Sequence, residues 1–263
     1  MSNSLYVYPD VGRTGLCNML FPWARAVLFA KKRGCKILAP RWTKLMRIGP
    51  WLRGERDKRY YSNQFTNSGY IKGCAKLVVF LQCINAVYIE DDDDLEKIDR
   101  GLVVFRGLGG HFSEIAKEAE FLKHELYRIV APQILDRLKC LPGRFIGVHI
   151  RCGDFVSTGQ NMSNEYYLRG IEAARAMAGV QLPVCVFSDA NPGELDWIKQ
   201  DDNIRLMPPA PALQDVLSLA RSEILVGTNI SSFSEWASFL GGMKTLWNKD
   251  GRMPSSGLNA EFV

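Results

Sequence analysis

The stretch Arg144-Phe-Ile-Gly-Val-His-Ile-Arg-Cys-Gly-Asp-Phe155 changes character within a few residues. Its first half is an apolar run of the length that forms a buried β-strand. A histidine and an arginine then flank Ile150, and Gly153-Asp154 breaks the extended pattern as a turn does. In open α/β sheets, ligands bind at the carboxyl ends of the strands. The stretch therefore predicts a strand that presents an imidazole, a guanidinium and a carboxylate at a ligand site.

These three polar side chains have two interpretations. Arginine suits an anion site because its planar fork grips two phosphate oxygens and stays charged at any working pH. On that interpretation His149, Arg151 and Asp154 form part of a binding or catalytic site. On the other, His149 is a hydrogen-bonded core residue, and Arg151 pairs with Asp154 to close the turn. The stretch alone leaves both interpretations open.

The rest of the C-terminal half alternates between strand and helix patterns. We expect strands at residues 183–187, 204–207, 224–226 and 244–247, and helices at 165–177, at 213–220 and after the loop from Gly227. Such an alternation is typical of a doubly wound parallel sheet. It therefore favours a Rossmann-like domain that contains the stretch from Arg144.

The N-terminal half opens with a strand at 5–8, a loop containing Gly12 and Gly15, and a helix expected to begin near Asn18, a favourable N-cap residue. A strand at 36–39 completes a βαβ unit. Further strands are expected at 77–81, 87–89 and from 103. The last runs into a glycine-rich loop, which places His111 at a second strand end where a ligand can bind. A helix capped by Ser113 should reach about residue 130. We predict two α/β domains, residues 1–138 and 139–263.

Composition limits the class of protein. Of the 263 residues, 47% are hydrophobic and 23% charged, which are ordinary globular values. The net charge of +5 suits an anionic ligand or membrane surface. No pattern typical of nucleic-acid recognition is present, so a nucleic-acid partner is not expected. The seven cysteines are scattered and form no CxxC pair, and the N-terminus is not a signal peptide. We expect a cytoplasmic protein.

Residues 40–61 are strongly basic and aromatic. They hold seven Lys or Arg residues against two acidic ones, interleaved with Trp42, Trp51, Tyr60 and Tyr61. Such a segment can rest on an anionic membrane surface or line a groove for a phosphorylated acceptor. The alternative is a solvated loop. The acidic run at 91–94 is interpreted as a solvated loop, because successive side chains of an extended run diverge and do not converge on one metal ion.

Three polar clusters fall at successive strand ends of the predicted C-terminal domain. They are His149 with Arg151 and Asp154; Ser188 with Asp189; and Thr228 with Asn229, Ser231 and Ser232. A helix that begins after the third cluster points free N–H groups and its positive dipole end at a ligand, which suits phosphate. Asp189 can accept the N1–H and exocyclic amino protons of guanine. Each cluster can equally be a structural feature, such as a helix cap or a turn.

Together these motifs resemble those of the α-1,2-fucosyltransferase superfamily, which is related to the α-1,6- and protein O-fucosyltransferases. Gly147-Val-His-Ile-Arg-Cys-Gly-Asp-Phe155 resembles its HxRxGD(Y/F) motif, and Phe187-Ser-Asp189 resembles its FSD segment. The stretch from Asp215 to Ala237 is similar to its D-x-x-x-M…N-S-S-F-S-W-W-A pattern, and Gly15-Leu-Cys-Asn18 to its opening G-L-G-N. The resemblance covers residues 144–240 well and the first half thinly.

The resemblance implies an α/β protein of GT-B type, with two Rossmann-like domains, parallel sheets and a cleft between them. It implies an inverting transfer of fucose from GDP-fucose to a glycan hydroxyl without a metal ion or other cofactor. The acceptor can be lipid-linked, and the enzyme can contact an anionic membrane surface. By matched position, the donor-binding residues are Arg151, Ser188, Asp189, Asn229, Ser231, Ser232 and Phe233, with His149 and Asp154 shaping the catalytic pocket and Gly15 and Asn18 on the acceptor side.

Three residues depart from the family pattern. Cys152 stands where a second arginine is usual, Cys17 replaces a glycine, and Glu235 replaces a tryptophan. Cys152 and Cys17 leave room for another nucleotide sugar as donor. A further hypothesis is a nucleotide-binding scaffold without transfer activity, against which Arg151, Asp189 and Ser232 argue. Asp154 and Asp10 are the candidates for the general base.

Overall fold

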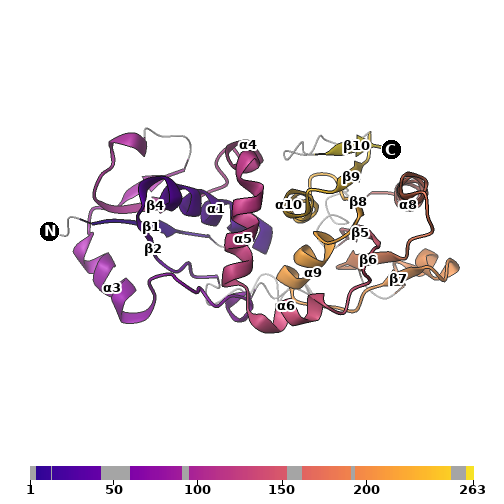
Figure 1. The fold of residues 1–263 in the computed structure, drawn as a ribbon, viewed down its shortest axis with the longest axis horizontal. Coiled ribbons are helices and arrows are strands. Elements are labelled where there is room, and N and C mark those ends of the chain that lie inside the picture. The colour runs from indigo at the N-terminus through magenta and orange to yellow at the C-terminus, as the bar shows by residue number, and fades with distance from the viewer. Residues whose placement is uncertain are drawn as a thin grey trace. The chain divides into compact units, whose positions relative to one another are not determined.

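The computed structural model describes residues 4–12, 14–42, 60–90, 95–152, 162–190, 193–249 and 259–263 (Figure 1). These residues form two compact units, one up to residue 132 and one from residue 133 onward. Most of the basic segment at 40–61, the acidic run at 91–94 and Asp154 lie outside the described residues. Each unit contains one parallel sheet flanked by helices, so the predicted α/β fold with two Rossmann-like parts is confirmed.

The first unit is built on a four-stranded sheet in the order β2-β1-β4-β3. Its strands are β1 (Leu5–Pro9), β2 (Lys36–Ile37), β3 (Val87–Ile89) and β4 (Gly101–Phe105). Its helices are α1 (Leu16–Arg33), α3 (Gly73–Gln82), α4 (Phe112–Ile115) and α5 (Ala119–Ile129), with short 3-10 turns at Ser62–Gln64, Leu95–Lys97 and Ala116–Glu118. All three strand pairings are parallel.

Successive side chains of each strand point alternately to the two faces of this sheet. Val7 and Val103 point to one face, where they pack with Phe29 of α1. Leu102 points to the other face and packs with Val79 of α3. The two helices therefore lie on opposite sides of the strands (Figure 1).

Three expectations for this unit were wrong. Residues 77–81 belong to helix α3 and not to a strand. The strand was expected there because a short apolar run fits the helix pattern and the strand pattern equally well. Helix α1 begins at Leu16, with Gly15 as its N-cap, so Asn18 lies inside the first turn. The helix expected from Ser113 is broken into α4, a 3-10 turn and α5, and α4 begins at Phe112.

The second unit is built on a six-stranded sheet in the order β10-β9-β8-β5-β6-β7. Its strands are β5 (Ile146–Ile150), β6 (Val184–Ser188), β7 (Ile204–Leu206), β8 (Ile224–Val226), β9 (Lys244–Trp247) and β10 (Ala260–Phe262). Its helices are α6 (Pro132–Leu138), α8 (Asn164–Ala178), α9 (Ala212–Leu219) and α10 (Ser232–Gly241), with a 3-10 helix at Asp196–Gln200. The edge strand β10 was not predicted from the sequence.

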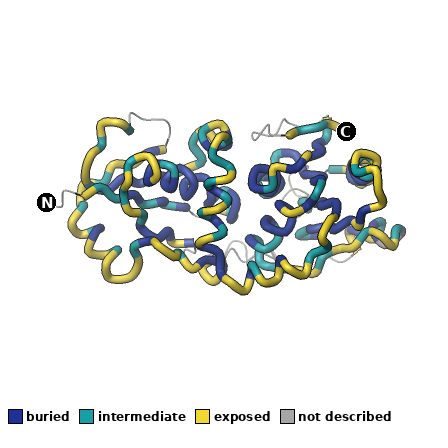
Figure 2. The backbone as a smooth tube through the Cα atoms, viewed as in Figure 1, coloured by how far each residue is buried: buried dark blue, intermediate teal, exposed yellow. Residues whose placement is uncertain are grey.

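The stretch that opens at Arg144 supplies β5, which lies in the interior of this sheet. Val148 and Ile150 point to the face covered by α8, where they pack with Tyr166 and Ile171. The opposite face is covered by residues of α9 and α10, which pack against Phe145, Phe187 and Leu225. Strands β4, β5, β6, β8 and β9 are mostly buried, whereas the edge strands β2, β3, β7 and β10 are largely exposed or half-buried (Figure 2).

The strand order reverses between β5 and β8. From β5 the chain proceeds outward through β6 and β7, and then returns to the other side of β5 with β8 and β9. Ligands of open α/β sheets bind at such a reversal, outside the carboxyl ends of the strands. Among the described residues, no helix has the length and apolar character needed to cross a lipid bilayer.

Candidate functional site

Most of the site residues predicted in the second unit lie around the reversal between β5 and β8. These strands pair in parallel, with Val148 opposite Val226, so the residues that follow them emerge side by side. Arg151 follows β5, and Thr228 follows β8. Asp189 follows β6, which pairs with the other side of β5. The described members of the three polar clusters therefore lie at one edge of one sheet.

His149 is a buried, neutral histidine. Its place in the pleat directs its ring to the α10 face, where Nδ1 lies 2.7 Å from the Ser234 hydroxyl. The Phe233 ring stacks on the imidazole, with centroids 4.7 Å apart and planes 18° apart. Burial first, and then the positive charge of Arg151, lower the pKa of His149 to about 3. At neutral pH the imidazole is therefore an uncharged, hydrogen-bonded core residue between β5 and α10, as the structural interpretation of the stretch predicts.

Thr228 joins the ends of β5 and β8. Its hydroxyl donates to the backbone oxygen of His149 at 2.7 Å and accepts from the backbone N–H of Arg151 at 3.2 Å. The Tyr167 hydroxyl lies 2.8 Å from the same oxygen atom. The backbone N–H of Thr228 donates to Ser234 Oγ at 2.9 Å. One buried side chain thus fixes the point at which Arg151 leaves the strand.

Arg151 is held by Asp189. The guanidinium forms an ion pair with the Asp189 carboxylate, and the side chains are 30% and 25% exposed. The other carboxylate oxygen accepts the backbone N–H of Cys152 at 2.7 Å. Burial and the Asp189 charge raise the pKa of the Cys152 thiol, which stays protonated. Asp189 therefore orients both residues that follow β5.

Ser188 and Asn229 make backbone contacts at the same edge. The Ser188 hydroxyl donates to the Ile150 carbonyl at 2.8 Å and accepts from the Ala190 N–H at 3.0 Å. The Asn229 amide donates to and accepts from the backbone of Asn248, both at 2.9 Å. These contacts brace neighbouring strand ends. The substrate contacts expected of both side chains stay predictions.

The N-terminus of α10 completes the site. Ser231 is its N-cap, Ser232 is its first residue and Phe233 follows. The first backbone N–H groups of a helix have no partner inside the helix and carry the positive end of its dipole. Ile230, just before the cap, has φ of 57°, a left-handed conformation that turns the chain into the helix. This end of α10 suits an anion.

The remaining predicted site residues are not part of this constellation. Gly15 and Asn18 lie at the start of α1 in the first unit, where Gly15 is the N-cap and Asn18 is partly buried. Asp154 lies outside the described residues. Sequence reasoning gave no role to Ser234 or Tyr167, although both support the site. The signal for Ser234 is its place within one helical turn of Ser231 in the first turn of α10.

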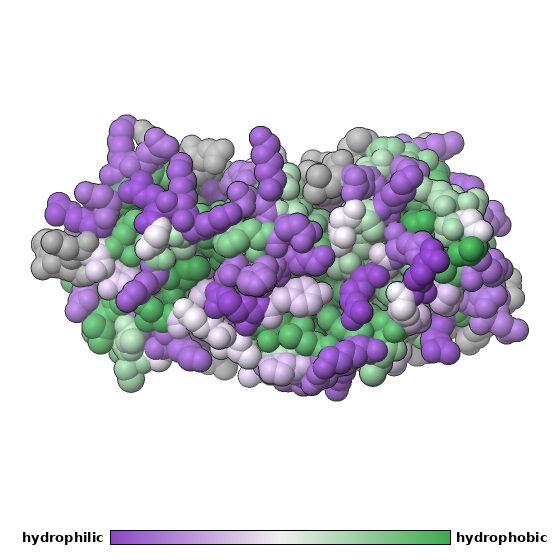
Figure 3. All heavy atoms as spheres, in the orientation of Figure 1, coloured by the Kyte–Doolittle hydropathy of each residue, from purple (hydrophilic) through white to green (hydrophobic). Residues whose placement is uncertain are grey.

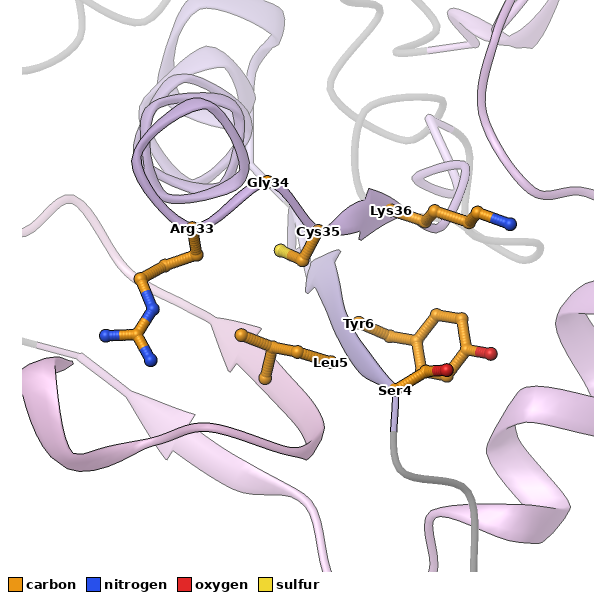
Figure 4. Close-up of a pocket in the computed structure, with 7 residues that line it drawn as sticks. All are labelled: Ser4, Leu5, Tyr6, Arg33, Gly34, Cys35 and Lys36. Atoms are coloured by element: carbon orange, nitrogen blue, oxygen red, sulfur yellow. The ribbon is translucent and has the colours of Figure 1, made fainter.

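A cavity of about 290 Å³ in the first unit is unrelated to this site (Figure 4). It lies at the amino end of β1 and the start of β2, whereas ligands of parallel sheets bind at the carboxyl ends. Its lining residues are Ser4, Leu5, Tyr6, Arg33, Gly34, Cys35 and Lys36.

Comparison with known proteins decides the family. The sequence profile of glycosyl transferase family 11 matches residues 108–255, which is more than half of the chain. The chain belongs to glycosyl transferase family 11. This match confirms the resemblance found in the motifs and identifies the protein as a glycosyltransferase. The comparison with curated protein sequences returned no match.

Solved structures show the fold of this family 11 chain. Fucosyltransferase NodZ from Bradyrhizobium is 18% identical with a TM-score of 0.57, over 91% of this chain and 94% of that one. POFUT1 in complex with GDP-fucose is 12% identical with a TM-score of 0.58, over 99% and 97% of the two chains. These likenesses establish the GT-B type of fold for the family 11 chain.

The buried His149 should make the stability of the family 11 enzyme depend on pH. The unfolded chain protonates this imidazole below about pH 6.5, whereas the folded chain keeps it neutral down to about pH 3. Protonation of His149 in the unfolded chain therefore costs the folded protein no unfolding free energy above pH 6.5. As the pH falls from 6.5 toward 3, this linkage steadily lowers the unfolding free energy. Within that window we expect His149→Gln to remove a slope of about 1.4 kcal/mol per pH unit from the unfolding free energy.

Urea denaturation at a series of pH values measures this slope. The matched control is His124→Gln, because the His124 side chain is 79% exposed and its substitution should leave the slope of the wild type. Equal slopes in the wild type and in His149→Gln would contradict the assignment of a buried neutral imidazole.

Proposed function

We propose that this family 11 glycosyltransferase transfers fucose from GDP-fucose to a hydroxyl of a glycan, with inversion and without a metal ion. The observation that carries the proposal is Arg151, held by Asp189 at the strand reversal, beside the N-terminus of α10. The choice of donor is supported by solved structures of the same fold: NodZ is an α-1,6-fucosyltransferase that was soaked with GDP-fucose. The second unit would then be the donor domain, and the first unit the acceptor-side domain.

In the proposed mechanism, Arg151 and the first turn of α10 bind the diphosphate. The bond from C1 of the sugar to the β-phosphate oxygen breaks, and negative charge grows on the departing GDP. A fixed guanidinium and a helix dipole stabilise that charge most when the bond is breaking, which is where binding energy accelerates a reaction. These positive groups would supply what a metal ion supplies elsewhere. The neutral His149, stacked on Phe233, keeps the wall of the pocket uncharged.

Inversion requires the acceptor hydroxyl to attack C1 from the face opposite the leaving group, and a base to take its proton. Asp154 is a candidate base from the sequence and lies outside the described residues. Asp10, the other candidate, is engaged by Arg106, whose Nε lies 3.1 Å from its carboxylate. The carboxylate of Asp10 is therefore already paired with a guanidinium.

Nucleotide binding tests the donor site directly. We expect GDP to stabilise the protein against heat more than UDP, ADP or dTDP do. Arg151→Ala should weaken GDP binding about 10- to 100-fold, because a charge-assisted contact to phosphate is lost. Arg169→Ala on the exposed side of α8 is the control and should bind like the wild type. Isothermal titration calorimetry gives the constants. A preference for UDP would change the donor, and no response to any nucleotide would favour the scaffold interpretation.

Asp189 has two proposed roles that one experiment separates. The sequence assigns it to the guanine base, whereas its contacts favour the orientation of Arg151. If it orients Arg151, Asp189→Ala should weaken GDP and inosine diphosphate equally, by about tenfold or more. If it reads guanine, the preference for GDP over inosine diphosphate, which lacks the exocyclic amino group, should disappear. Asp201→Ala breaks a comparable pair with Arg175 in the same unit and serves as the control.

We also propose that the first unit rests on an anionic membrane surface and takes a lipid-linked acceptor. The basic residues that suggested this, including Arg53, Arg56 and Arg59, lie outside the described residues. The support comes from α3. Leu77, Leu81 and Ile84 are 59%, 67% and 86% exposed, and Val78, Val87 and Tyr88 are exposed beside them. Figure 3 shows apolar atoms gathered over α3 at the lower left.

The charge pattern around this face favours a lipid surface as its occupant. Between residues 70 and 89 the charged residues are Lys72 and Lys76, and none is acidic. An exposed apolar helix face with cationic neighbours is typical of a helix that lies in the headgroup region of an anionic bilayer. All seven cysteines are free thiols, which fits the reducing cytoplasmic side of such a membrane.

Vesicle flotation tests the membrane proposal. We expect the wild type to bind vesicles that contain phosphatidylglycerol and to bind pure phosphatidylcholine less. Leu77→Glu and Leu81→Glu should each reduce binding several-fold, because a charge replaces an inserted side chain. Leu206→Glu, at an exposed leucine of the second unit, should have no effect. The proposal fails if the wild type does not float, or if sedimentation shows that the α3 substitutions dissociate a dimer.

A further inference from the structure

Four charged side chains of the first unit lie together at the carboxyl end of its sheet. Asp10 follows β1, and Arg106 follows β4, which pairs with β1 in parallel. The two side chains form an ion pair, with Arg106 Nε 3.1 Å from the Asp10 carboxylate. Arg41 follows β2, and Lys76 reaches the same edge from helix α3. Ligands of parallel α/β sheets bind outside the carboxyl ends of the strands.

Lys76 lies where the chain leaves β2 and β1. Its ammonium donates to the backbone oxygen of Ala39 at 2.6 Å, two residues before Arg41. The same nitrogen lies over the Tyr8 ring, 4.4 Å from the centroid. Tyr8 packs on the α3 face of the sheet and stands two residues before Asp10. One ammonium group therefore contacts the chain within two residues of Arg41 and within two residues of Asp10.

The charges of this group act on one another. Burial first, and then the positive charge of Arg41, lower the pKa of the Lys76 ammonium, whereas Asp10 raises it. Burial and then Asp10 raise the pKa of the Tyr8 phenol to about 12. The positive charges of Arg41 and Arg106 oppose this rise. Because like charges held together disfavour their own charged forms, a bound anion would stabilise this excess of cations over one carboxylate.

The cations are held in place but remain open to solvent. The Arg106 guanidinium lies over the Tyr88 ring of β3, with Cζ 4.0 Å from the centroid. The backbone N–H of Arg106 donates to the Ile89 oxygen at 2.9 Å. The Arg106 side chain is nevertheless 42% exposed, while Arg41 is exposed and Lys76 is half-buried. Fixed donors lose little conformational freedom when they bind, which favours affinity for an anion that reaches them.

These three cations, the Arg41–Lys76–Arg106 cluster, border the exposed apolar face of α3. Lys76 directly precedes Leu77, and Tyr88, which lies against Arg106, is 52% exposed beside that face. An anion bound by the cluster would therefore lie next to the surface proposed to rest on a membrane. Where a glycan is joined to its lipid through phosphate, that phosphate lies at the membrane surface.

We propose that the Arg41–Lys76–Arg106 cluster binds the phosphate groups through which an acceptor glycan is joined to its lipid. This inference rests on the proposed function and specifies the acceptor as a glycosyl phosphate or diphosphate lipid. Guanidinium groups bind phosphate oxygens in pairs, and an ammonium adds a point charge. The contacts are to phosphate and not to sugar, so the cluster selects how the glycan is carried rather than which glycan it is.

Titration calorimetry with octyl diphosphate, kept below its micelle concentration, tests this proposal. The Arg151→Ala protein is the background, so that diphosphate bound in the second unit does not contribute. In this background, Arg41→Ala and Lys76→Met should each weaken binding about tenfold, because one charged contact is lost. Lys72→Ala, at an exposed lysine just before α3, is the matched control and should bind like the background protein.

The acidic member of the group provides a test of opposite sign. Asp10→Asn removes the carboxylate that competes with the ligand for Arg106, so it should tighten octyl diphosphate binding about threefold. Arg41 is exposed, so its substitution leaves the fold intact. Unchanged binding in Arg41→Ala and Lys76→Met, or weaker binding in Asp10→Asn, would overturn the proposal.

Vesicle flotation separates an acceptor phosphate from the headgroups of the bilayer itself. Arg41→Ala should lose no more binding to phosphatidylglycerol vesicles than Lys72→Ala does, since each removes one surface cation. A larger loss would assign the cluster to headgroups and overturn the proposal. If the wild type transfers no fucose from GDP-fucose but the cluster variants lose octyl diphosphate, the proposed function fails and the phosphate site stands. If fucose is transferred and the variants bind octyl diphosphate normally, this inference alone fails.

Discussion

The Thr228 side chain is the contact on which the second unit's site depends. Its hydroxyl group donates to the β5 backbone at His149, accepts from the N–H of Arg151 just after β5 and lies beside the Tyr167 hydroxyl of α8. Thr228 itself is fully buried. A buried hydroxyl that lost these partners would leave several backbone groups unsatisfied at once. The positions of Arg151 and of the N-terminus of α10 are therefore set together.

His149 and Arg151, two polar residues at the end of β5, lie in opposite environments, one enclosed and the other partly exposed. His149 is still inside the sheet, so its side chain is enclosed by α10 and loses its charge. Arg151 lies two residues further on, beyond the last ladder pair, where an ion pair and partial solvent access keep it charged. One strand end therefore holds a neutral imidazole and a charged guanidinium two residues apart, without placing two like charges side by side.

Much of the second unit follows from the sequence, because few folds other than a parallel α/β sheet alternate short apolar runs with helix patterns. The first unit was harder to predict. The apolar run at 77–81 in α3 fits the pattern of a strand as well as that of a helix. The packing of Val79 against the sheet, which favours the helix, is a tertiary contact that the sequence does not show. In the site, the sequence located Arg151 and Asp189 but not their ion pair. That pairing depends on the adjacency of β5 and β6, which is a tertiary property.

Both sheets are entirely parallel, and this has a consequence for folding kinetics. Each pairing joins segments separated by a whole crossover, so loop-closure entropy opposes every ladder and slow folding is expected. The candidate site needs β5, β6 and β8 in register at once. Partly assembled chains therefore lack it, and the nucleotide proposed to bind there would act only on the completed unit. Ligand present during refolding would draw the equilibrium toward the native state by mass action, much as a pharmacological chaperone does.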